Sequence, residues 1–110
     1  MSYLPAPFKK FIGRYPEISR MYEELALACH EAGPLDEKTR RLVKLGIAIG
    51  HQSEGATKSH ARRALEGGAT AEEVRHTVLL ALTTAGLPAM TAAALWVEQV
   101  LSNRSDSSSG

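Results

Sequence analysis

The sequence is poor in the residues that mark several classes of protein. Among its 110 residues there is one cysteine, Cys29, and only 5% are aromatic. A lone cysteine can form neither an intramolecular disulfide nor a structural zinc site. Cys29 shares a helical spacing with Leu25, so we expect it to be a small core residue. With few aromatic rings, the core must consist of Ala, Leu, Val and Ile, which favours closely packed helices.

An excess of one charge and a long apolar run are also missing. Thirteen Lys and Arg against twelve Asp and Glu leave a net charge of +1, whereas nucleic-acid-binding domains are usually strongly basic. No run approaches the ~20 apolar residues of a membrane helix, and the N-terminal residues lack the order of a signal peptide. We therefore expect a cytoplasmic protein that binds neither nucleic acid nor membrane.

Apolar residues recur at helical spacing in six segments, which predicts an all-α fold. Within the third segment, the residues after Arg41 are apolar over most of the helix circumference, so this helix should be central. Residues 1–101 are expected to form one domain, and the Ser-rich residues 102–110 a disordered tail. Helix starts and stops are expected at Pro16, Gly33-Pro34, Asp36, Ser53, the capping box Thr70-Ala71-Glu72-Glu73, and Gly86-Leu87-Pro88.

Four segments, in this order and spacing, resemble the carboxymuconolactone decarboxylase family, which includes alkyl hydroperoxidase D-like proteins. They are Leu35–Arg40, Ser59–Leu65, Gly68–Val74 and Gly86–Ala89. The resemblance implies an all-α fold of about six helices in an alkyl hydroperoxidase D-like arrangement. It also implies assembly as a homotrimer, or as a hexamer made of trimers. We expect no cofactor.

The chain departs from the peroxidase-like branch of this family at the residues that carry its chemistry. That branch has a Cys-x-x-Cys pair at the start of the fourth helix, where the helix N-terminus lowers the pKa of a thiol. Counted back from His60, these positions hold Ser53 and Ala56, and a glutamate of the branch falls at Arg41. Serine cannot form a disulfide, so peroxide reduction by the thiol mechanism of the family is not expected. The decarboxylase branch keeps a histidine at the position of His60 without the cysteine pair.

His60 and Glu54 are the candidate catalytic residues. His60 lies on an apolar helix stripe, where an imidazole can donate or accept a proton near neutral pH; the alternative is a buried histidine with one structural hydrogen bond. Glu54 precedes it by six residues, a rise of ~9 Å along a helix, so direct contact is not obvious. The alternative for Glu54 is a charge that stabilises the helix dipole.

Arg41, His51 and Ser53 are the candidate substrate-binding residues. Arg41 suits a substrate carboxylate, and the alternative, which the spacing favours, is a surface ion pair with Glu37, four residues earlier. His51 lies in a loop and faces either a pocket or solvent. The spacing of the histidines matches no known zinc motif, so we expect no metal. His30 and His76 are expected at the surface.

Two hypotheses follow from these residues. The first is a decarboxylase-like lyase that acts on a small acidic organic molecule, with His60 as acid or base. The second is a non-catalytic oligomeric protein of the same fold with a vestigial site. Convergence of His51, Ser53, Glu54 and His60 on one pocket would favour the enzyme, and apolar surroundings of His60 would favour the second hypothesis.

Overall fold

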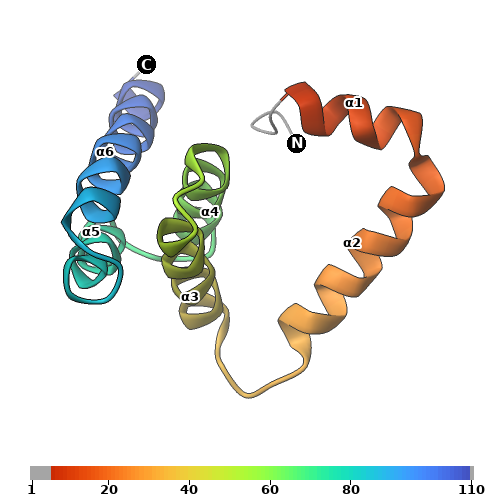
Figure 1. The fold of residues 1–110 in the computed structure, drawn as a ribbon, viewed down its shortest axis with the longest axis horizontal. Coiled ribbons are helices and arrows are strands. Elements are labelled where there is room, and N and C mark those ends of the chain that lie inside the picture. Colours follow the sequence, from red (N-terminus) through yellow and green to blue (C-terminus); the bar gives the residue numbers. More distant parts are fainter. Residues whose placement is uncertain (1–5, 110) are drawn as a thin grey trace. The chain divides into compact units, whose positions relative to one another are not determined.

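The computed structural model describes residues 6–109, and within them the chain forms six α-helices, one short 3-10 helix and no strand (Figure 1). The prediction of an all-α fold with six helices is confirmed. The chain divides into two compact units, an N-terminal unit of residues 1–35 and a C-terminal unit of residues 36–110. The helices are α1 (Ala6–Arg14), α2 (Pro16–Glu31), α3 (Glu37–Gly50), α4 (Glu54–Glu66), α5 (Ala71–Leu80), the 3-10 helix η1 (Ala81–Thr83) and α6 (Leu87–Ser109).

In the N-terminal unit, α2 begins at Pro16 as predicted, but two of its residues lie where the sequence did not place them. Cys29 is exposed, and His30, expected at the surface, is 9% exposed. The buried positions of α2 are Ser19 and His30, which are eleven residues apart and so point in nearly the same direction from a helix with 3.6 residues per turn. Cys29 points about 100° away from His30, on the side of Leu25, which is also exposed.

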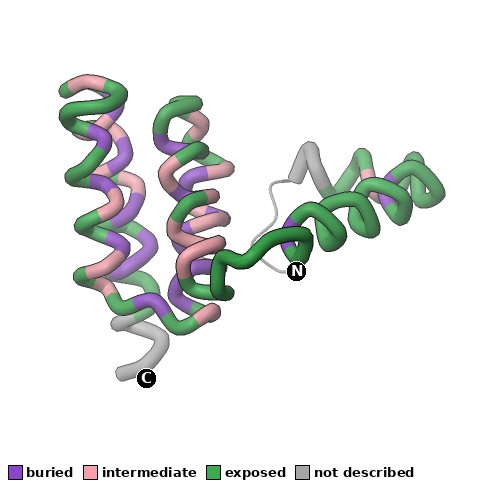
Figure 2. Tube along the Cα trace, turned by 90° about the horizontal axis from the view of Figure 1, so that it is seen from below, coloured by how far each residue is buried: buried purple, intermediate pink, exposed green. Residues whose placement is uncertain are grey.

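The core of the C-terminal unit is built from small and branched aliphatic side chains. In this unit α3 packs against α4, and α6 packs against both α4 and α5. Figure 2 marks the buried positions along these four helices. Among the residues whose burial is described, fifteen apolar residues are buried; seven of them are alanine and none is aromatic, as the composition predicts. The core cluster comprises Leu45, Ile49, Ala61, Ala64, Leu65, Ala69, Val74, Val78, Ala81, Ala93, Val97, Val100 and Leu101.

Only one face of α3 is buried, although its sequence predicted a helix covered on most sides. Leu45 and Ile49 are fully buried in the core, whereas Val43 is 45% exposed and Ile47 is 65% exposed. Periodicity shows that both faces are apolar, but it does not show which neighbour covers each face. An apolar stripe of α3 is therefore open in this structure.

The predicted helix caps are present. Asp36 accepts a hydrogen bond from the amide of Thr39 at 2.8 Å, and Ser53 accepts one from the amide of Ala56 at 3.2 Å. At α5, the hydroxyl of Thr70 accepts from the amide of Glu73 at 3.0 Å, while the Glu73 carboxylate accepts from the amide of Thr70 at 2.9 Å. Side chains that satisfy these free amides fix the first residue of each helix.

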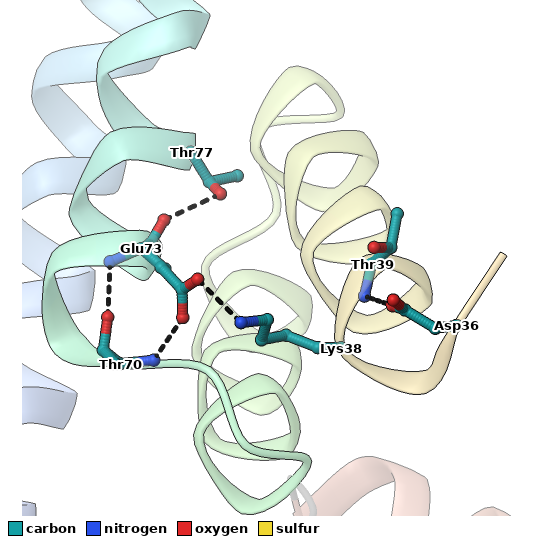
Figure 3. Close-up of polar contacts among 6 residues, drawn as sticks. All are labelled: Asp36, Lys38, Thr39, Thr70, Glu73 and Thr77. Carbon is teal, nitrogen blue, oxygen red and sulfur yellow. Dashed lines mark hydrogen bonds and ion pairs between the residues drawn. The ribbon is translucent and has the colours of Figure 1, made fainter.

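Glu73 also links two helices that are distant in sequence (Figure 3). Its second carboxylate oxygen lies 2.9 Å from the ammonium of Lys38, in the first turn of α3. The hydrogen bond from Lys38, and after it the one from the backbone of Thr70, lowers the pKa of Glu73. The starts of α3 and α5 are thus joined by one carboxylate.

The last helix runs further than expected. It continues to Ser109 instead of ending near Leu101. The disorder predicted for residues 102–110 stays a prediction; Gly110 lies outside the described residues, and side chains are described only as far as Arg104. Among the described residues, no helix combines the length and the apolar character needed to cross a membrane.

Candidate functional site

His60 lies in the second half of α4, on a helix whose start is fixed by the Ser53 cap. Its neighbours Ala61 and Ala64 are fully buried in the core, and His60 itself is half-buried. The Nδ1 atom of the ring is buried and has no hydrogen-bond partner in the described part of the chain. Buried polar atoms are rarely left unpaired. This nitrogen is therefore a candidate contact for a bound molecule.

The electrostatic environment of His60 is cationic. Burial lowers the pKa of His60 below its ordinary value of 6.5, and the charges of Arg63, Lys44 and Arg41 lower it further, in that order. No carboxylate is among the groups that shift this pKa. The imidazole is therefore neutral at neutral pH, with one nitrogen that donates and one that accepts a hydrogen bond. A neutral base among cations is suited to binding an anion.

Arg41 forms the ion pair that was the alternative to substrate binding, and its role toward a substrate stays a prediction. Its Nε donates to Glu37 at 2.7 Å, the surface ion pair expected for residues four apart on a helix. Its charge also acts on His60. The aliphatic part of its side chain lies against Gly67, at the C-terminal end of α4. The approach is so close that a Cβ atom on residue 67 would be 3.2 Å from the Arg41 Cγ. The structure therefore brings Arg41 of α3 close to the helix that carries His60.

The other predicted site residues have different surroundings. The Ser53 hydroxyl accepts the capping hydrogen bond from Ala56. Glu54 forms an ion pair with Lys58 at 2.9 Å, and its side chain is more than half exposed. His51 is exposed at the C-cap of α3. In the structure these three residues lie near the junction of α3 and α4, but no hydrogen bond or ion pair within the described chain joins them to His60. The described residues contain no group of His, Cys, Asp and Glu able to hold a metal.

Sequence reasoning missed three residues near His60. Lys44 and Arg63 were not among the predicted site residues, yet their charges act on the imidazole. Thr57 was not singled out, although its side chain is completely buried and its Oγ1 has no partner in the described chain. A signal was available on α4, because Thr57, His60 and Arg63 follow one another at three-residue spacing and such residues are neighbours on a helix surface.

A groove of about 190 Å³ lies elsewhere, between α5 and α6, and shares no residue with the His60 site. Two of its lining residues form an ion pair, in which the guanidinium of Arg75 donates to both carboxylate oxygens of Glu98 at 2.8 and 3.0 Å. The groove is lined by Arg75, Val78, Leu79, Met90, Ala94, Val97 and Glu98. It offers a mainly apolar floor, and its two charges already neutralise each other.

The fold and the candidate site together describe a small all-α protein in which the candidate histidine, His60, lies on a helix without cysteine at its start. The family model of the carboxymuconolactone decarboxylase family matches residues 16–99. The chain belongs to this family. The match begins at the first residue of α2 and extends into α6, so it includes helices of both units.

Among the related proteins, one solved structure carries the same family name and two proteins are uncharacterized. The crystal structure of an apo carboxymuconolactone decarboxylase family protein from Legionella pneumophila is 29% identical, with a TM-score of 0.76, over 87% of this chain and 86% of that one. An uncharacterized protein from Methanocaldococcus jannaschii is 30% identical over 79% of this chain and 85% of its own length. An uncharacterized protein from Haemophilus influenzae is 32% identical over 57% of this chain, a match that spans 56% of that relative.

A further solved structure supports the fold alone. The Thermotoga maritima protein TM1620 is 22% identical to this chain, with a TM-score of 0.64, and the match covers 89% of this chain and 98% of that one.

Proposed function

We propose that this protein binds a small organic molecule with a carboxylate group at His60, and that it acts as a decarboxylase-like lyase with His60 as the proton-transfer residue. One observation carries the proposal: a half-buried imidazole has an unpartnered ring nitrogen, and the charges of three cationic side chains lower its pKa. Such surroundings complement an anion and keep the empty ring neutral, so that it can accept a proton.

Decarboxylation requires that negative charge on the substrate is stabilised and that a proton is delivered to the carbon. When the bond to the departing carboxylate breaks, carbon dioxide leaves and the electron pair stays on the substrate, so negative charge develops there. The charges of Arg41, Lys44 and Arg63 stabilise that charge. A bound carboxylate also offsets these cations and raises the pKa of His60, so the imidazolium forms and delivers the proton to the carbon.

The roles predicted for Glu54, His51 and Ser53 stay predictions. Glu54 would have to leave Lys58, and Ser53 would act only through an oxygen that already caps α4. Peroxide reduction by the family's thiol mechanism is not proposed, because Ser53 and Ala56 occupy the positions of the cysteine pair and the only cysteine of the sequence is Cys29.

Thermal unfolding with a panel of acids tests the proposal. Suitable probes are benzoate, cis,cis-muconate, succinate and a carboxylated γ-lactone, because a ligand that binds the folded state raises the melting temperature. We expect at least one probe to stabilise the protein, and this shift to disappear in His60→Gln. His76→Gln is the matched control, since His76 is exposed on α5. An equal shift in both variants would contradict a site at His60.

Turnover is measured on any acid that binds. We expect the wild-type protein to release carbon dioxide from a bound acid and His60→Gln to release none. Binding without release of carbon dioxide would support the carboxylate site at His60 and would refute the lyase activity.

A non-catalytic oligomer is the second candidate, favoured by the apolar surfaces that the helices leave open. Ile18, Met21 and Tyr22 of α2 and Ile47 of α3 are all more than half exposed, and exposed apolar patches mark sites of association. A homotrimer or a hexamer would cover them. Light scattering after size exclusion should show one of these assemblies, and a stable monomer would refute both. A cytoplasmic location stays a prediction from the sequence.

A further inference from the structure

Two unpartnered polar atoms lie one helical turn apart on α4. The Oγ1 of Thr57 and the Nδ1 of His60 are both buried and form no hydrogen bond in the described chain. The third such atom, Ser19 Oγ, belongs to the N-terminal unit. Residues three apart on a helix have Cβ atoms about 5–6 Å from each other. The Thr57 and His60 side chains are therefore close enough for one small group to contact both.

A core position rarely keeps a hydroxyl without a partner. Thr57 is among the largest fully buried side chains, with Ala61 and Ala64 also fully buried on the same helix. Valine has the same shape and no polar atom to leave unpaired, so it should pack better here. The Thr57 hydroxyl lowers the stability of the ligand-free protein, and its presence is explained if it has a hydrogen-bond partner in the ligand-bound state.

We propose that Thr57 is a ligand-binding residue, and that its hydroxyl and the Nδ1 of His60 hydrogen-bond to the same carboxylate group of the bound molecule. This inference rests on the proposed function, whose site it completes. A carboxylate has two oxygens that accept hydrogen bonds, and the Thr57 hydroxyl and the Nδ1–H form of the imidazole can each donate one. The surrounding charges of Arg41, Lys44 and Arg63 match the sign of such a group.

The burial of Thr57 adds one requirement. Its side chain has no exposed surface, whereas His60 beside it is partly open to solvent. A molecule therefore reaches the hydroxyl only when side chains around Thr57 move. Binding is then coupled to a local rearrangement at α4.

Isosteric substitution separates the hydroxyl from the shape of Thr57. Thr57→Val removes the hydroxyl and Thr57→Ser retains it, while Ser59→Ala is the matched control, because Ser59 is a buried hydroxyl two residues further along α4. The melting temperature without ligand and the dissociation constant for benzoate and cis,cis-muconate, by calorimetry, are measured for each variant. We expect Thr57→Val to lose at least tenfold in affinity with an equal or higher melting temperature, and Thr57→Ser and Ser59→Ala to bind like the wild type.

Each other outcome overturns the inference in a recognisable way. If Thr57→Val binds as tightly as the wild type while His60→Gln does not, the proposed function stands and Thr57 has no part in it. If Thr57→Val melts at a lower temperature without ligand, the hydroxyl has a partner within the fold. If the wild type binds neither probe, the carboxylate site itself is wrong, and this inference fails with the proposed function.

Discussion

Replacing Leu45 by alanine tests whether α3 is packed as the structure has it. Leu45 is 0% exposed and belongs to the core cluster. The substitution deletes the equivalent of about three methylene groups, at about 0.8 kcal/mol each, and leaves a cavity. Because the surrounding core is rich in alanine, few long side chains are available to fill that cavity. We expect the free energy of unfolding to fall by about 3 kcal/mol, which lies in the usual range for buried Leu→Ala changes.

The matched control is Ile47→Ala, two residues further along the same helix. Ile47 is 65% exposed, so its truncation should cost less than about 0.5 kcal/mol. The assay is urea unfolding followed by circular dichroism at two protein concentrations, with the free energy taken from midpoints at constant slope. Concentration matters because association stabilises a protein by mass action.

Two results would refute this reasoning. A loss below about 1 kcal/mol for Leu45→Ala would show that Leu45 is not in a packed core. An equal loss for Ile47→Ala at both concentrations would show that the open face of α3 is covered within the chain. If the loss for Ile47→Ala grows with protein concentration instead, this face lies in an interface between copies.

Three further predictions follow from individual residues. Burial lowers the pKa of His60 in the folded state, so the unfolded state takes up more protons as the pH falls. The stability contributed by neutral His60 is therefore present above pH 6.5 and is lost as the pH falls through the folded pKa. His60→Gln should therefore reduce the fall of the urea midpoint between about pH 7 and pH 5, and an unchanged fall would show that the ring is not desolvated. Thr70→Ala should cost about 1 kcal/mol in urea unfolding through loss of the α5 cap, and Thr70→Ser should restore most of it; no loss would mean that the cap is dispensable. Gln52 has a positive φ of 57°, so Gln52→Gly should stabilise by about 0.5–1 kcal/mol; destabilisation would show that the Gln52 side chain makes a needed contact.

Much of the fold was predictable because its determinants are local. Asp36, Ser53 and Thr70 each satisfy an amide within three residues, and this interaction depends only on the adjacent sequence. The side of α2 that is buried was not predictable. Its apolar residues lie on several sides of the helix, and the buried stripe contains Ser19 and His30, two polar residues that periodicity assigns to the surface.

The site was predictable in part, for a similar reason. His60 was predicted through its family position and Arg41 through the match of its charge to a substrate carboxylate, both visible in the sequence. The effect of Lys44 on His60 acts between two helices, and the unpaired state of the Thr57 hydroxyl depends on everything packed around it. Neither property can be derived from one segment, because each depends on how α3, α4 and their neighbours are packed.

The alanine-rich core has a consequence for how stability changes with temperature. Seven of the fifteen buried apolar residues are alanine, so each ordered residue removes little apolar surface from water. The heat-capacity change of unfolding scales with that surface and is usually about 12–15 cal/mol/K per residue. A C-terminal unit with this core should lie below that range, and its stability curve should be correspondingly flat. Such a protein loses little stability on cooling, and its enthalpy of unfolding changes slowly as the temperature rises.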